Sequence, residues 1–303
     1  MKKILFIISF TILISDLAFS QQVPQVSQNM FNKLANNPAS AGSNDAINAY
    51  VVHRQQWMGF EGSPVTSIFS VDAPVPMLNG GLGLNIITDQ VAQFSNLDLQ
   101  LSYAYQTQLG SGQLGLGAAA GMYQSGLDGT QLNASQSGDP DIPTGEISGS
   151  AIDFGLGLYY NTRDVYIGLS SLHVTEPTIE KTDGKIIELS RHYFLLAGYY
   201  HEINPLVSLN PSIYLKSDGA TSQLDVNTNI LYNNKIWGGV SYRLDEGIVF
   251  LTGLNINEDL KFGLAYDVVL NKIKNNSVEF MLGYRFNVDY DRPVKSYKNP
   301  RYL

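Results

Sequence analysis

The sequence predicts an all-β protein, a transmembrane antiparallel β-barrel of about 14 strands of the outer-membrane type. Three observations support this prediction. Apolar and polar residues alternate with a period of two through most of the chain, as in strands with one apolar face. The alternating segments are even in number, so antiparallel strands can close without a free edge. No helical stripe of comparable length follows residue 20.

Residues 1–20 are expected to form a secretory signal peptide. Lys2 and Lys3 precede an apolar run from Ile4 to Ile14, and Ala18-Phe19-Ser20 supplies the small residues expected before a cleavage site. A buried N-terminal helix is the alternative, and both flanks of the run fit export better. The chain contains no cysteine, which excludes thiol chemistry and cysteine-ligated metal sites.

The composition is compatible with a barrel and argues against a nucleic-acid-binding protein. The formal net charge is -8, whereas nucleic-acid surfaces need basic patches. Only 15% of the residues are charged, and the mean hydropathy is -0.06. A soluble secreted domain has similar averages, but alternating lipid-facing and lumen-facing residues also cancel in this way.

The barrel is expected over residues 46–287. Most alternating segments have about 9–12 residues, which suits tilted strands that cross a bilayer and exceeds the usual length of soluble sandwich strands. The expected strands begin near Ala46, Pro64, Gly80, Ser95, Gln113, Ser150, Asp164, Arg191, Leu206, Thr221, Lys235, Gly247, Leu260 and Ser277.

The two faces of these strands predict which side meets lipid. Several charged residues fall opposite the apolar face, where a lumen tolerates them: Asp98, Asp153, Asp225, Lys261, Asp267, Glu279 and Arg285. Five tyrosines fall on the apolar face and are expected in interfacial aromatic girdles, with core positions as the alternative: Tyr103, Tyr105, Tyr160, Tyr266 and Tyr284.

Loop lengths predict an orientation. If the chain enters the first strand from the periplasm, the two longest gaps, 125–149 and 174–190, are both outer loops, and the tight turns face inward. Residues 21–45 are then a periplasmic N-terminal segment and residues 288–303 a periplasmic C-terminal tail. The basic tail either contacts a partner, tucks into the barrel or frays.

No catalytic, cofactor-binding or metal site is expected, and therefore no enzyme. The G-x-G-x-x-G match at 110–115 is followed by a strand rather than the helix that a nucleotide site needs. The four histidines form no spaced metal pair, and no G-x-S-x-G elbow exists. Asp139, Asp141 and Glu146 lie in the long loop at 125–149, where turn chemistry explains them better than a calcium site.

Two motifs near the first strand are distinctive. "NPASAG" precedes it and "RQQWMGFEGSP" follows it, and the order and spacing of both resemble the start of the PorP/SprF family. Later blocks, including the terminal "NPRYL", are also similar, while Ser40 stands where an aromatic is common. The matching residues are Asn37, Pro38, Ala39, Ala41, Gly42, Arg54, Gln56, Trp57, Gly59, Phe60, Gly62, Pro64, Asn299, Pro300 and Arg301.

The resemblance implies an outer-membrane barrel of Bacteroidetes-type bacteria that takes part in type IX protein secretion and, in some lineages, gliding motility. It implies a non-enzymatic component without cofactor that supports secretion or surface attachment of cargo. The partners expected are outer-membrane lipid, periplasmic secretion components or a peptidoglycan-binding protein, and secreted surface proteins or adhesins. No nucleic acid is expected.

Two other functions stay open. The first is a passive small-solute porin, whose lumen Tyr159, Trp237 and Arg285 would narrow and residues 21–45 would plug. The second is an outer-membrane hydrolase. In the barrel, "RQQWMGFEGSP" is expected to close the first outer hairpin, with Arg54 toward the lumen and Trp57 toward lipid. Gly59 and Gly62 would allow the turn, and Pro64 would open the next strand.

Overall fold

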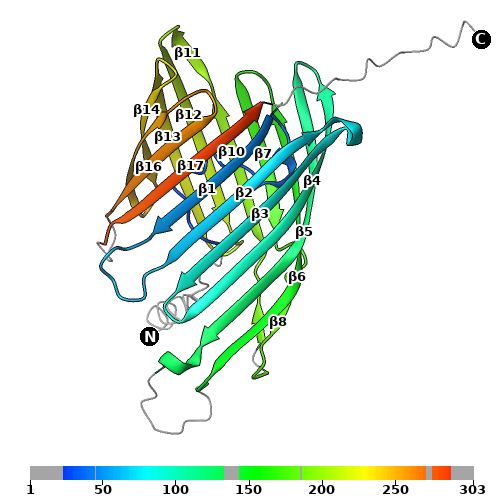
Figure 1. Cartoon of the computed structure of the whole chain (residues 1–303), viewed down its shortest axis with the longest axis vertical. Helices are drawn as coiled ribbons and strands as arrows, with labels where there is room; N and C mark the ends of the chain where they lie inside the picture. The colour runs from blue at the N-terminus through cyan, green and yellow to red at the C-terminus, as the bar shows by residue number, and fades with distance from the viewer. Residues whose placement is uncertain (1–22, 45, 133–142, 185, 271–274, 288–303) are drawn as a thin grey trace, which may run out of the picture.

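The structure is a computed structural model that describes residues 23–44, 46–132, 143–184, 186–270 and 275–287 (Figure 1). The expected signal peptide and C-terminal tail, the latter including Asn299, Pro300 and Arg301, lie outside the described residues. The described strands are β1 Ala46–Gln55, β2 Val65–Val75, β3 Gly80–Val91, β4 Phe94–Leu109, β5 Gly112–Asp128, β6 Glu146–Asn161, β7 Val165–Leu172, β8 Thr178–Glu180, β9 Ile186–Glu188, β10 His192–Tyr199, β11 His201–Asn204, β12 Val207–Ser217, β13 Ser222–Tyr232, β14 Ile236–Arg243, β15 Gly247–Asn255, β16 Leu260–Val269 and β17 Ser277–Asn287.

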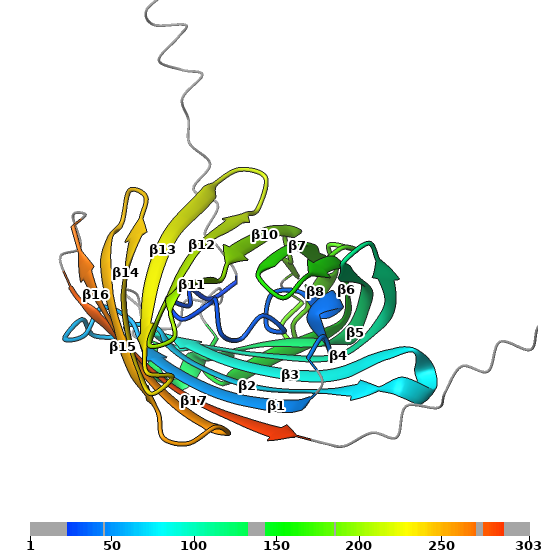
Figure 2. The same ribbon diagram turned by 90° about the horizontal axis from the view of Figure 1, so that it is seen from above.

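These strands form a closed antiparallel barrel. One sheet holds all of them except β8 and β9. Strands that follow one another within this sheet pair antiparallel, β7 pairs with β10 across the β8–β9 hairpin, and β1 pairs with β17. β10 and β11 both pair with β12 and are one strand interrupted at Tyr200, so the described residues form a 14-stranded ring. Figure 2 shows this ring from above. The predicted fold class is confirmed.

Thirteen of the fourteen predicted strand starts agree with the structure to within one residue, because period-two alternation begins where a strand meets a turn. The exception is β6, which begins at Glu146 rather than near Ser150. β4, β5 and β6 have 16, 17 and 16 residues and exceed the expected length. A separate hairpin, β8–β9, was not expected, and it packs Ile179 and Leu189 against Tyr123 of the extended β5.

The wall has polar residues inside and apolar residues outside. Leu101 and Ile152 are 61% and 69% exposed, whereas Asp225 and Glu279 are 0% exposed. This reversal of the soluble pattern is what a barrel in lipid requires. The predicted inward residues Asp98, Asp153, Asp225, Asp267 and Glu279 are all buried. No helix within the described residues is long and apolar enough to cross a membrane.

The barrel has two different ends. The short-turn end carries the tight turns after β2, β4, β6, β11, β13 and β15, and both Ala46 and its partner Asn287 lie there. The long-loop end carries the connections after β1, β5 and β7, including the β8–β9 hairpin. Three short 3-10 helices complete the described elements: η1 Pro38–Ser40, η2 Pro76–Leu78 and η3 Gly129–Gln131.

Candidate functional site

The candidate site is the lumen, which residues 23–44 occupy; we call this segment the plug. Figure 2 shows it at the blue end of the colour scale, inside the ring of strands. It runs from the long-loop end, where Val23 meets Lys216 of β12, to the short-turn end, where Gly42 meets Asp72 of β2. This position differs from the expected periplasmic segment. The plug lies in the lumen because the wall supplies partners for its backbone and side chains along its whole length.

A cluster of buried charges holds the plug at the long-loop end. The Arg54 guanidinium lies 2.6 Å from Asp267 and 3.3 Å from Glu279, and Arg243 lies 2.9 Å from Asp267 and 3.1 Å from Asp225. All five side chains are at most 3% exposed. Burial of charge is costly unless each group is paired and hydrogen-bonded. Here each arginine pairs with two of the three carboxylates, while Arg54 Nε has no hydrogen-bond partner among the described residues.

Ser27 of the plug sits at the centre of this charge cluster. Its hydroxyl accepts hydrogen bonds from Arg54 (2.9 Å) and Arg243 (3.1 Å) and donates to Asp267 (2.9 Å). The backbone N–H groups of Ser27 and Gln28 donate to the two oxygens of Glu279, at 2.7 and 2.8 Å. Charged hydrogen bonds of this kind are stronger than neutral ones, so the cluster fixes the register of the plug.

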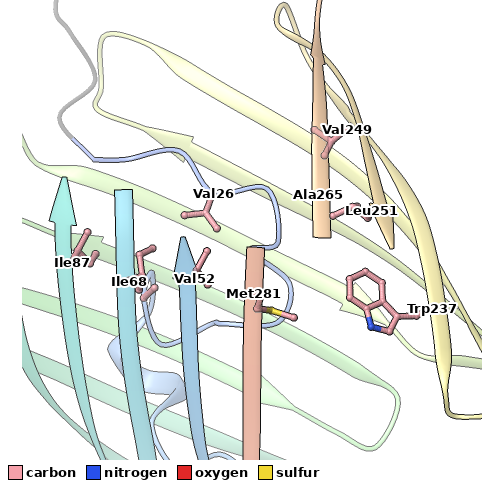
Figure 3. Packing of buried hydrophobic residues seen from close by; sticks show 10 residues of the cluster. Val26, Val52, Ile68, Ile87, Trp237, Val249, Leu251, Ala265 and Met281 are labelled. Atoms are coloured by element: carbon pink, nitrogen blue, oxygen red, sulfur yellow. The ribbon is translucent and has the colours of Figure 1, made fainter. Parts of the chain in front are cut away.

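Lys216 adds a further contact beside the cluster. Its ammonium donates to the Val23 carbonyl at 3.1 Å and to Gln25 Oε1 at 3.0 Å, and the residue is 1% exposed. Val26 then packs among apolar wall residues. Figure 3 shows Val26 close to Val52, Ile68 and Ile87 in the largest apolar cluster of the lumen. Polar and apolar contacts therefore alternate along the first plug residues.

The "NPASAG" motif anchors the plug at the short-turn end. Asn37 caps η1 by accepting from the Ala39 N–H at 2.9 Å, and Pro38 takes the first helical position. The Asn37 amide also donates to the Leu158 carbonyl at 2.9 Å, which ties the cap to β6. Asn37, Ala39 and Ala41 are 0% exposed.

The wall facing this motif consists of small residues. A Cβ at Gly117 would overlap with the backbone of Ala39, and a Cβ at Gly81 would overlap with Ala41. Gly42 has a φ of +62°, and a Cβ there would lie 2.7 Å from the Ala73 carbonyl oxygen. The motif therefore needs small residues, because the plug backbone lies directly against the strand backbone. Larger side chains on either side would separate the two backbones.

The "RQQWMGFEGSP" motif serves two purposes. Arg54 faces the lumen, as predicted, and belongs to the charge cluster. The residues after it form the β1–β2 loop, in which Gln56 N–H donates to the Pro64 carbonyl at 2.9 Å. Trp57 is half-buried, and its indole nitrogen is covered.

The rest of this loop joins neighbouring loops at the long-loop end. Gly59 and Gly62 have positive φ, as the expected turn requires, and Phe60 is 58% exposed. The Gly62 carbonyl accepts from Ala92 between β3 and β4, and the Met58 carbonyl accepts from the Asn275 amide before β17. Pro64 immediately precedes β2.

Other groups cover the lumen at the long-loop end. His173 Nδ1 lies 2.9 Å from Asp153, and its ring meets those of Tyr123 and His192 edge-on. Both histidines are buried. No group of three potential metal ligands occurs among the residues that the structure describes. The His173–Asp153 pair is best explained as an internal contact beneath the β8–β9 hairpin.

A cavity of about 490 Å³ opens at the short-turn end between the plug and the wall; we call it the vestibule. Strands β12–β17 form much of its wall, and residues of β1, β2, β7 and β10 complete it. Lys33 of the plug, Lys261 of β16 and Arg285 of β17 line it, together with aromatic residues such as Phe31 and Trp237. Burial and, to a smaller degree, repulsion from Lys261 lower the pKa of Lys33 to about 8. Of the three residues expected to narrow the lumen, Tyr159 and Trp237 are each 3% exposed, whereas Arg285 is exposed.

The structure thus brings most of the motif residues to the plug or to one loop. Asn37, Pro38, Ala41, Gly42 and Arg54 line the plug contact, while Gln56, Trp57, Gly59, Phe60, Gly62 and Pro64 form the β1–β2 loop. Sequence reasoning did not identify Ser27, Lys216 or Arg243 as plug contacts. The sequence shows that charged residues occupy lumen-facing positions, but it does not show which plug residue each of them contacts.

Comparison with known families and structures agrees with this architecture. The family model described as "Type IX secretion system membrane protein PorP/SprF" matches residues 18–284. Comparison with curated proteins gives no match. Similar solved structures include the Pseudomonas putida toluene transporter TodX, with 13% identity, a TM-score of 0.49, and coverage of 84% of this chain and 93% of that one.

Two further barrels are similar to a comparable degree. The Ralstonia pickettii toluene transporter TbuX has 16% identity and a TM-score of 0.46, and covers 84% of this chain and 93% of that one. A Pseudomonas aeruginosa FadL homologue has 11% identity and a TM-score of 0.46, and covers 83% of this chain and 93% of that one. Such distant similarity carries no information about what this chain transports or binds.

Proposed function

The chain belongs to the PorP/SprF family of type IX secretion system membrane proteins, and from this premise we propose that it is a closed, non-enzymatic outer-membrane component of that secretion and gliding apparatus. It supports secretion or surface attachment of cargo proteins rather than diffusion of small solutes. The observation that carries this proposal is the plug, which fills the lumen and is held at both ends. A diffusion porin needs a continuous aqueous path, which a fixed plug opposes.

The proposed orientation places the long-loop end outside the cell and the short-turn end in the periplasm. The asymmetry of the loops supports it, because outer-membrane barrels have short periplasmic turns and longer outer loops. In this orientation β1 begins and β17 ends in the periplasm, while the first plug residues approach the outer face. The extended strands β4–β6 and the β8–β9 hairpin then offer the outer surface for cargo, and the vestibule opens toward periplasmic partners.

Accessibility of single cysteines tests the orientation, since the chain has none of its own. Phe60→Cys, in the β1–β2 loop, is expected to react with a membrane-impermeant maleimide on intact cells. Glu258→Cys, in the turn between β15 and β16, is expected to react only after the outer membrane is permeabilised. The reverse pattern would contradict the proposed orientation.

Gene deletion in the source bacterium tests the secretion role. We expect the deletion strain to lose secretion or surface display of particular cargo proteins while uptake of small solutes is unchanged. Wild-type chain and the Gly145→Ala variant should both restore display, because a Cβ at Gly145 meets open space. Normal display of every secreted protein, together with reduced uptake of small solutes, would favour a porin instead.

A further inference from the structure

The vestibule has the features of a binding site that is separate from the plug contacts. It opens at the short-turn end, the end nearest the viewer in Figure 2, and plug residues 30–34 form part of its wall. Its volume of about 490 Å³ is enough for a few amino-acid residues.

Three cations line the vestibule without a carboxylate partner. Within the described residues, no carboxylate oxygen lies within 4.0 Å of Lys33, Lys261 or Arg285. Lys33 Nζ instead donates to the Tyr159 hydroxyl at 3.1 Å and lies 3.7 Å from the centre of the Tyr166 ring. Lys261 Nζ lies 4.7 Å from the centre of the Phe31 ring.

The carboxylates that share the vestibule are engaged elsewhere or lie at its mouth. Asp72 accepts from the Gly42 N–H at 2.9 Å and from the Asn48 amide at 3.4 Å. Asp259 accepts from the Asn287 amide at 3.4 Å, and Glu258 is exposed in the β15–β16 turn. At the other end of the plug, by contrast, each buried arginine has at least two carboxylates close by. Lys33, Lys261 and Arg285 are thus cations without an ion pair among the described residues, in a cavity whose lining also holds three carboxylates.

We propose that the vestibule binds an acidic peptide segment of a partner protein that approaches from the short-turn end. The carboxylates of the segment pair with Lys33, Lys261 and Arg285, and the segment lies beside Trp237. Phe31 and the tyrosine rings suit apolar or aromatic residues beside the acids. The binding chemistry is independent of the secretion role; only the partner's periplasmic location rests on the proposed function and orientation.

Trp237 allows a direct test, because it lines the vestibule and the chain has only one other tryptophan. We suggest titrating full-length Trp57→Phe protein in detergent micelles with an end-blocked peptide, Asp-Tyr-Asp-Phe-Glu, and with its matched amide form, Asn-Tyr-Asn-Phe-Gln. We expect a saturable change in Trp237 emission that salt weakens. The amide peptide should bind at least about 10-fold more weakly, which corresponds to about 1.4 kcal/mol.

Substitutions then locate the binding. Lys33→Gln and Lys261→Gln should each weaken the acidic peptide at least about 10-fold. Lys235→Gln, an exposed lysine in a turn at the same end that does not line the vestibule, should leave its affinity unchanged. Equal binding of the amide peptide, equal loss from Lys235→Gln, or no saturable change would overturn the proposal. So would acetate that competes at concentrations similar to the peptide's, since that outcome assigns the site to small anions.

The outcomes for the vestibule and for secretion are distinguishable. If the peptide does not bind but the deletion strain loses cargo display, the vestibule proposal fails and the secretion role stands. If the peptide binds and display is normal, the secretion role fails and the acidic-peptide site stands.

Discussion

The two ends of the plug are held by different physical means. At the long-loop end, two arginines and three carboxylates surround Ser27, and the contact depends on complementary charge. At the short-turn end, Asn37 to Gly42 lie against strand backbone, and the contact depends on the absence of side chains from the wall. Steric fit tolerates almost no enlargement, whereas a charge cluster tolerates changes that keep its charges balanced. At the short-turn end, larger side chains should therefore be the most destabilising changes, whereas at the long-loop end the most destabilising changes should be those that leave a charge unpaired.

The largest effect is expected from Gly117→Val. A Cβ at this position already overlaps with the Ala39 backbone, so η1 cannot dock, and we expect a loss of more than about 3 kcal/mol. The loss is measured as a shift in the urea midpoint of the barrel in micelles. Heat-modifiable gel mobility reports the folded fraction. Gly145→Val is the matched control, because nothing lies within 4 Å of a Cβ there. Equal midpoints for the two variants would show that wall and plug do not meet at Gly117.

Arg54→Met is expected to have the next largest effect. It removes the cation between Asp267 and Glu279, and breaking one partner of a buried charge set costs about 3–5 kcal/mol. The same urea measurement applies, and Arg163→Met in an exposed turn provides the control. Adding Glu279→Gln to Arg54→Met should recover part of the loss, since fewer unpaired charges remain. No recovery would argue against a balanced charge cluster.

Ser27→Ala probes the plug side of the same cluster. The hydroxyl is lost but the Ser27 N–H still donates to Glu279, so we expect a cost of about 1–3 kcal/mol. Hydrogen exchange of the peptide that contains residues 27 and 28 should speed up while exchange of residues 37–42 stays slow. Ser43→Ala serves as control. Uniformly faster exchange along the plug would mean that the two ends are not independent.

The smallest effect concerns pH. The pKa of Lys33 is lowered to about 8, against 10.5 for the free side chain, so the unfolded state binds more protons above pH 8. Burial of the charged lysine therefore disfavours the folded state below pH 8, and stability rises as pH increases through this range. Between pH 7 and pH 8.5 the gain contributed by Lys33 should be below about 1 kcal/mol. Urea midpoints at both pH values measure the gain in the wild-type chain and in Lys33→Met, and the gain should be smaller in the variant by this amount.

The fold could be predicted from the sequence because the wall obeys a local rule. Each strand alternates apolar and polar residues, so its position follows from residues that are neighbours in the chain. The start of β6 was misplaced because Gly145 to Gly149 contain too few apolar residues to show alternation. The β8–β9 hairpin was missed because each of its strands has only three residues.

The contents of the lumen could not be predicted in this way. Ser27 lies 240 residues from Asp267 and 252 from Glu279 in the sequence, and no local pattern connects them. Residues 21–45 contain no long alternating segment, so the sequence predicted a periplasmic segment, and a plug only under the porin alternative. The motif residues were recognised through resemblance, but only the structure explains them: Asn37, Ala39, Ala41 and Gly42 fit the wall, and Arg54 pairs with buried acids.

Single-channel conductance in planar bilayers tests the central claim most directly, namely that the plug keeps the barrel closed. The full mature chain should show no steady conductance. A variant that lacks residues 23–44, and whose heat-modifiable gel mobility confirms a folded barrel, should show long-lived channels of uniform size. Equal, stable conductance of the mature chain and the deletion variant would contradict the account, since the plug would then not close the lumen.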